Sequence, residues 1–200
     1  MRLYLILLMF FLFMSGCAQK ISNKQELLSD WQAHLDKQAR WKANGKLAFI
    51  SKQSPPSVNF TWQNQGDSKS PDFKLKLTTI FGTQILALTQ TKSSAQLDYD
   101  GVTYLDVDAQ NLLNRLTNLS FPVNDAANWL KGRPQSLNIK YDEFDRIMLA
   151  SIKDNQGENW QVTYNQYVKK NGVWLPTKLN LVNNNLKIKI KMQIHSWQFN

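Results

Sequence analysis

The sequence predicts a mainly β fold with a few helices (α+β): a curved antiparallel sheet, or incomplete β-barrel, of about ten to eleven strands closed by helices. Polar and apolar residues alternate in segments such as 58–62, 73–77 and 186–194, the period of a strand with one wet face and one apolar face. Asp-Gly and Asn-Gly pairs separate such segments at the spacing of tight hairpins. Helical periodicity is confined to short segments, which we expect to cover the concave side of the sheet.

The first element is an export signal at the N-terminus. Arg2 precedes an apolar run of about 12 residues, LYLILLMFFLFM, which is too short for a permanent membrane helix. The small residues Ser15 and Gly16 follow, and then Cys17, the only cysteine of the chain. This arrangement resembles a bacterial lipoprotein box, which implies that residues 1–16 are a cleaved signal peptide and that Cys17 is the lipidation site.

The segment after the signal is interpreted as an anchor followed by one domain. Alanine rather than aspartate at position 18 resembles an address to the outer membrane. Residues 17–23 are expected to be a lipidated tether and residues 24–200 a single domain, a length sufficient for one large core. The formal net charge of +9 suggests anionic lipid head groups or an acidic protein partner, because export makes nucleic acid an unsuitable ligand. Solubility alone is the simpler explanation of this charge.

An amphipathic helix is predicted next. Ser22 and Gln25 have the spacing of a capping box. Apolar residues then recur at helical intervals, namely Leu27, Leu28, Trp31 and Leu35. A helix packed on the domain and a helix lying on the membrane surface both fit this pattern, and the acidic residues on it favour packing.

Turn residues divide the remaining chain into hairpins and two helical interruptions. The pair at 100–101 separates AQLDY from VTYLD, and the pair at 171–172 separates VTYNQYV from VWLPTKL. A helix is predicted from the cap Asp108 through residue 119, and a shorter one ends at Gly132. The resulting half-barrel can enclose either a packed core or a lined cavity, because periodicity does not separate the two.

Catalytic and metal-binding patterns are missing from the sequence. The two histidines, His34 and His195, do not stand at ligand spacing, and the lone cysteine argues against a zinc site. The aspartates at 106 and 108 fit a strand end followed by a helix cap, and those at 142–145 fit a hairpin turn. We therefore expect no enzyme, no metal and no cofactor.

Several segments together resemble the family of the outer-membrane lipoprotein receptor LolB. They are WKANGKLAF from Trp41, YDGVTY from Tyr99, FPVNDAANWLKGRP from Phe121, WQVTYNQY from Trp160 and LPTKLNL from Leu175, which leads to KIKIKMQIHSW. No single motif decides the match, but their order and spacing extend over essentially the whole mature chain. The resemblance implies an antiparallel half-barrel closed by helices around a hydrophobic cavity.

The resemblance also implies a function and partners. Members of that family accept lipoproteins from the periplasmic carrier LolA and deliver them into the outer membrane, without ATP or a cofactor. A monomeric, lipid-anchored, periplasm-facing protein is therefore expected, with acylated lipoproteins and outer-membrane lipid as its other partners. The expected acyl-chain cavity is lined by Phe49, Phe60, Trp62, Leu75, Leu77, Trp129, Trp160, Tyr164, Ile188 and Ile190.

One loop is expected to meet the membrane. Ile80, Phe81 and Gly82 lie where the chain turns between two strands, and an apolar pair at a loop tip needs a reason because loop tips are normally wet. In the family the corresponding loop protrudes and carries an exposed hydrophobic residue, which maps onto Phe81. The family often has proline and leucine where this chain has Ile80 and Phe81. Phe81 inserting into lipid and Phe81 folding back on the sheet are the two alternatives.

Two other functions compete with lipoprotein acceptance. A similar pocket serves equally well to sequester a small apolar ligand, and a solid core would indicate a purely structural lipoprotein. The basic residues Lys187, Lys189 and Lys191 fit an acidic rim of the carrier or lipid phosphates, and they also fit an ordinary solvated sheet face.

Overall fold

The computed structural model describes residues 31–50, 57–66, 72–117, 119–136 and 138–199. The predicted signal peptide, the tether with Cys17 and the predicted capping box lie outside these described residues. Among the residues that the structure does describe, no helix combines the length and the apolar character needed to span a membrane.

The described residues form one antiparallel sheet of 11 strands, in the order β6-β5-β4-β3-β2-β1-β11-β10-β9-β8-β7. The prediction of a mainly β, antiparallel fold is confirmed. Two runs of sequential hairpins, β1 to β6 and β7 to β11, meet where β1 pairs with β11. The strands are β1 (Trp41–Ile50), β2 (Val58–Asn64), β3 (Phe73–Thr78), β4 (Gln84–Gln90), β5 (Ala95–Tyr99), β6 (Val102–Asp106), β7 (Ile139–Tyr141), β8 (Ile147–Lys153), β9 (Asn159–Lys170), β10 (Val173–Asn183) and β11 (Ile188–Phe199).

The sheet has the one-sided apolar character that the alternation predicts. Along β3, Phe73, Leu75 and Leu77 are buried while Lys74 and Lys76 are exposed. The strand predicted at 186–194 begins later than expected, at Ile188. Residues 184–187 form the turn before it, in which Asn183 Oδ1 accepts a hydrogen bond from the Leu186 amide at 2.9 Å and Lys187 takes a φ of 54°.

Two hairpins close as the turn residues predict. Asp100 and Gly101 have φ of 53° and 76°, and Asn171 and Gly172 have φ of 49° and 82°. Positive φ at both central positions matches the right-handed twist of the flanking strands, which is why these residue pairs occur there.

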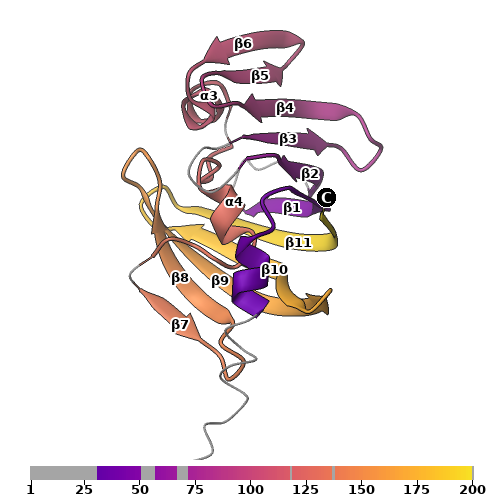
Figure 1. The fold of residues 1–200 in the computed structure, drawn as a ribbon. Helices are drawn as coiled ribbons and strands as arrows, with labels where there is room; N and C mark the ends of the chain where they lie inside the picture. The colour runs from indigo at the N-terminus through magenta and orange to yellow at the C-terminus, as the bar shows by residue number, and fades with distance from the viewer. Residues whose placement is uncertain (1–30, 51–56, 67–71, 118, 137, 200) are drawn as a thin grey trace, which may run out of the picture.

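Helical segments cover one face of the sheet. These are α3 (Ala109–Leu116) and α4 (Ala126–Trp129), and residues 31–36 are also helical. The predicted cap is confirmed, since the Asp108 side chain accepts from the Asn111 amide at 2.9 Å. In Figure 1, α3 lies beside β5 and β6, while α4 and the indigo helix lie in front of the strands below them.

The helical residues 31–36 pack on the domain, as the favoured alternative predicts. Trp31 and Leu35 are buried in the same core cluster as the sheet residues. Arg133, which follows α4, forms an ion pair with Asp36 at 2.9 Å and donates to Gln32 Oε1 at 3.1 Å. The helix is therefore held by apolar packing and by polar contacts to the segment after α4.

A glycine permits close packing at the centre of the sheet. Gly45 lies at a bulge in β1, where the pairing with β11 shifts between Asn44 and Gly45. A Cβ atom at this position would lie 2.0 Å from the Gln193 carbonyl oxygen and 2.7 Å from the Phe60 ring. The Phe60 ring therefore occupies the space that a side chain at residue 45 would need.

Candidate functional site

The residues predicted to line the cavity lie on one side of the sheet. The pairing register places Phe60 opposite Leu77, Trp62 opposite Leu75 and Phe49 opposite Ile190, all on the covered face. The members from β9 and β11 continue the same face, since Leu179 of β10 pairs with both Tyr164 and Met192. Trp129 belongs to α4 and is part of the same core cluster. The structure thus brings together side chains from both halves of the chain.

These side chains are buried in the hydrophobic core. All ten predicted residues belong to or pack against the hydrophobic core, and all are buried except Ile188, which is half-buried. Phe49 meets Phe121 of the segment between α3 and α4 at a ring-centroid distance of 6.0 Å. Trp62 stacks on Phe73 at 4.5 Å. The cover and the sheet are therefore in direct contact.

Three hollows described in the structure lie elsewhere. Their volumes are about 600, 370 and 460 Å³, and none of them is lined by any of the ten residues. The structure thus shows the predicted cavity residues packed against one another. The Phe49–Phe121 contact would have to open for a ligand to lie between the cover and the sheet at this point.

Two buried glutamines hold α3 in place, and sequence reasoning did not find them. Gln90 Oε1 accepts from the Ala109 amide at 2.7 Å, which satisfies one of the free donors at the start of α3. Gln110 accepts from the Val123 amide at 2.8 Å and donates to the Phe121 carbonyl at 3.0 Å. Glutamine is usually exposed, so the sequence carries no signal for this role.

The α4 segment is tied to the sheet by one buried hydrogen bond. The Tyr164 hydroxyl donates to the Trp129 carbonyl at 2.8 Å, and the Trp129 indole donates to the Pro122 carbonyl at 2.8 Å. Burial raises the pKa of Tyr164 well above its ordinary value, so its hydroxyl stays protonated and remains a donor. Tyr164 therefore links the sheet to its cover.

Asp125, at the start of α4, is expected to make the stability of the protein depend on pH. Burial raises the pKa of its carboxyl above 3.8, and the hydrogen bond from Asn128 (2.6 Å) opposes this only in part. The folded protein therefore holds the proton more tightly than the unfolded chain, so Asp125 favours folding at low pH and this contribution is lost as pH rises through the raised pKa. Asparagine resembles the protonated, neutral form of aspartate. Asp125→Asn is therefore expected to be more stable than the parent at neutral pH and equally stable at pH ~3. Urea unfolding at both pH values tests this, and an equal difference at both would contradict it.

The predicted loop is exposed. Thr79 and Thr83 pair at its base, with the Thr79 amide donating to the Thr83 carbonyl at 2.8 Å, and the Gly82 amide donates to the Thr79 carbonyl at 3.0 Å. Gly82 has φ of 90°, a conformation that glycine adopts without strain. Ile80 is 62% exposed and Phe81 is 89% exposed. Phe81 does not fold back on the sheet.

The charged clusters have structural partners. Asp142 forms an ion pair with Arg146 at 2.7 Å. Burial by itself raises the pKa of Asp142, but hydrogen bonds from the Arg146 and Phe144 amides and from the Arg146 guanidinium outweigh it and lower the pKa. Within the described part of the chain, no group of three or more His, Cys, Asp or Glu side chains is placed to hold a metal ion.

Of the three basic residues predicted on the last strand, one lies in the preceding turn and two lie on the exposed face of the sheet. Lys189 and Lys191 are exposed on β11, on the side of the sheet opposite the packed interior, and Lys187 lies in the preceding turn. They are thus separate from the residues of the candidate site.

The sequence matches a protein-family model described as "Outer membrane lipoprotein LolB" over residues 39–197. The chain belongs to the LolB family. Relatives named "Outer-membrane lipoprotein LolB" include one from Pseudoalteromonas translucida (strain TAC 125), 45% identical over 100% of this chain and 96% of the relative. Another, from Psychromonas ingrahamii, is 32% identical over 96% of this chain and 95% of the relative.

Solved structures share the fold at low sequence identity. A LolA superfamily protein from Nitrosomonas europaea superposes with a TM-score of 0.56 at 10% identity, covering 88% of this chain and 93% of that one. A putative outer membrane lipoprotein-sorting protein domain from Vibrio parahaemolyticus gives 0.54 at 10% identity, covering 88% and 91%. The open sheet with a short helical cover is thus the fold of these proteins as well.

Membership of the LolB family establishes the location and general role of the chain. It is a lipid-anchored outer-membrane protein of the lipoprotein-localisation (Lol) pathway. The predicted resemblance and the predicted location are confirmed. LolB is a lipoprotein-localisation receptor and not a known enzyme family.

Proposed function

We propose that this LolB family member accepts acylated lipoproteins from the carrier LolA, shelters their acyl chains between the sheet and its helical cover, and inserts them into the outer membrane. The observation that carries the proposal is the continuous apolar face built from both halves of the sheet, which α3, α4 and the helical residues 31–36 cover in the described part of the chain. Acylated Cys17 would anchor the receptor itself, and the function needs no cofactor.

The energetics of lipid transfer explain why a sheltered route is needed. Burial of acyl chains contributes about 0.8 kcal/mol per methylene, so a triacylated lipoprotein with on the order of 45 methylenes gains up to roughly 35 kcal/mol. Release into water on that scale is far too slow for delivery. A transfer from one apolar interior directly to another avoids this barrier and proceeds if the receptor binds the chains more tightly than the carrier does.

The exposed loop supports the insertion step. Phe81 projects from the turn between β3 and β4 with almost no cover from the rest of the molecule. A large apolar side chain at a protruding tip is suited to enter the lipid surface, where its burial contributes about 1.5–3 kcal/mol. We propose that Phe81, with Ile80 beside it and Gly82 shaping the turn, holds the receptor against the membrane while acyl chains leave.

A transfer assay tests the proposal. Purified LolA loaded with a triacylated lipoprotein is mixed with this chain, and the cargo is followed by co-purification and then by recovery in vesicles of outer-membrane lipid. Transfer to the receptor and then to vesicles is expected. Binding of a fluorescent fatty acid without any transfer from LolA would instead support sequestration of a small apolar ligand, and binding of neither would support a structural lipoprotein.

A further inference from the structure

We infer that acyl chains enter between α3 and the turn joining β8 to β9, and that Gln156 in this turn holds that entrance shut. The inference rests on the proposed function, because it states where the ligand of that function passes. Its basis is a polar bridge between two parts of the molecule that belong to opposite ends of the sheet.

The two sides of the proposed entrance are far apart in the sheet order. Among the strands, α3 packs against β4, β5 and β6. The β8–β9 turn belongs to strands near the other edge of the sheet, and seven strands lie between β5 and β8 in the sheet order. A contact from α3 to this turn therefore joins the two ends of the curved sheet across its covered face.

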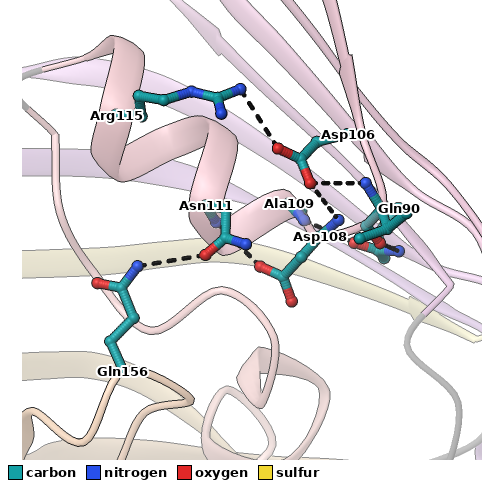
Figure 2. Close-up of polar contacts among 8 residues, drawn as sticks. Gln90, Asp106, Asp108, Ala109, Asn111, Arg115 and Gln156 are labelled. Atoms are coloured by element: carbon teal, nitrogen blue, oxygen red, sulfur yellow. Dashed lines mark hydrogen bonds and ion pairs between the residues drawn. The ribbon is translucent and has the colours of Figure 1, made fainter.

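The contact consists of two hydrogen bonds to one side chain. Asn114 Nδ2 donates to Gln156 Oε1 at 2.6 Å, and Gln156 Nε2 donates to Asn111 Oδ1 at 3.4 Å. Asn111 and Asn114 are three residues apart, so both face the turn from one side of α3. Figure 2 shows Gln156 reaching Asn111 from below the helix. We call these three side chains the clasp.

The helix side of the clasp is fixed independently of Gln156. Asp108 caps α3 by accepting from the Asn111 amide at 2.9 Å, and Arg115 forms an ion pair with Asp106 at 3.3 Å (Figure 2). Gln90 holds the first turn of α3 from β4. The contacts with Asp106 and Gln90 tie α3 to its own end of the sheet, and none of the three contacts involves Gln156.

The turn side is fixed as well. Asp154 Oδ1 accepts from the amides of Gln156 and Glu158 at 3.0 and 2.9 Å, and its second oxygen accepts from the Trp160 indole at 3.1 Å. The turn thus presents Gln156 on a rigid base. Rotation of the Gln156 side chain is sufficient to break both bonds of the clasp.

The clasp is an exposed polar attachment between α3 and the far half of the sheet. Its hydrogen bonds are exposed, so water replaces them at little cost. A second exposed attachment joins Gln32 Nε2 of the helical residues 31–36 to the Asp145 carbonyl at 3.0 Å. The attachment from the Tyr164 hydroxyl to the Trp129 carbonyl is buried, and breaking it leaves unpaired polar groups in an apolar interior. Opening at the α3 side therefore breaks exposed hydrogen bonds and leaves the buried attachment of α4 in place.

A reversible staple tests the entrance. The full chain carrying Cys17→Ala, Asn111→Cys and Gln156→Cys has only two thiols, because Cys17 is its single native cysteine. A short bis-methanethiosulfonate reagent links them, and stopped-flow fluorescence follows uptake of dansylundecanoic acid. Stapling is expected to slow uptake at least about tenfold, and reduction is expected to restore it.

A second staple, placed where it does not cross the proposed entrance, controls for effects of the cross-linking reaction itself. Asp106→Cys with Arg115→Cys, again with Cys17→Ala, joins α3 to the strand on which it already packs, and uptake is expected to be unchanged. Uptake at the unstapled rate in the Asn111/Gln156 staple would overturn the inference. Failure of the reduced protein to bind the fatty acid at all would overturn the proposed function itself, and the inference with it.

Removal of the clasp provides the opposite test. Gln156→Ala leaves the exposed turn intact and is expected to speed fatty-acid uptake at least about twofold, because it removes both hydrogen bonds of the clasp. An uptake rate equal to that of the parent would also overturn the inference, because the clasp would then not hold the entrance.

Discussion

Phe81→Glu is expected to block delivery of lipoproteins to the outer membrane while leaving the fold and acyl-chain binding intact. Phe81 is 89% exposed, so the substitution removes no packing within the protein. It does remove the apolar group proposed to enter lipid and places a charge at the same point. The expected loss is about ten- to a hundredfold in the insertion rate, since burying one phenylalanine contributes about 1.5–3 kcal/mol.

The measurement is cargo transfer from this receptor into vesicles, with fatty-acid binding as the parallel readout. Leu105→Glu is the matched control, because Leu105 is 72% exposed on the edge strand β6 and not on the loop tip. Delivery by the Leu105 variant is expected to equal that of the parent. If Phe81→Glu delivers cargo at the parental rate, the membrane role of the loop is wrong.

Gly45→Ala is expected to cause the largest loss of stability of any single substitution considered for this chain, about 2–4 kcal/mol. The added Cβ would lie 2.0 Å from the Gln193 carbonyl oxygen, which is main chain and part of the pairing between β1 and β11. The strand pair must separate to admit the methyl group, and the Phe60 ring must also move. Both halves of the sheet meet at this pair, so the damage is not local.

Urea or thermal unfolding measures this effect, and Gly82→Ala is the comparison. A Cβ at Gly82 meets no atom within 4 Å, but its φ of 90° disfavours other residues. The cost there is expected to be about 1 kcal/mol, from backbone strain alone. Equal losses at the two positions would contradict the steric explanation for Gly45.

The strands were predictable because their signals are local. AQLDY and VTYLD coincide with β5 and β6, since alternation defines each strand and the Asp100–Gly101 pair defines the turn. The start of β11 was wrong by two residues because alternation continues through Leu186, whereas Asn183 captures the Leu186 amide in a turn. The pairing of β1 with β11 has no local signal, and tertiary contacts decide it.

The sequence predicts which residues of the candidate site share one face of the sheet, but it does not predict whether that face encloses a cavity. A period of two assigns each strand residue to one side of the sheet, so Phe60, Trp62 and Leu75 could be grouped from the sequence. Whether that side is open depends on how closely segments such as 121–130 approach it. The buried roles of Gln90 and Gln110 and the exposed bridge to Gln156 depend on long-range geometry, which composition does not encode.

The pairing of β1 with β11 has a consequence for how the protein is made. Strands that pair from opposite ends of a chain impose a high contact order and slow folding. An outer-membrane lipoprotein emerges from the secretion channel with its N-terminus first, so Trp41–Ile50 reaches the periplasm long before Ile188–Phe199. Until translocation is complete, β1 lacks one neighbour and offers an unpaired edge to other chains. Truncation of the last strand is therefore expected to leave an aggregation-prone polypeptide rather than a smaller working receptor.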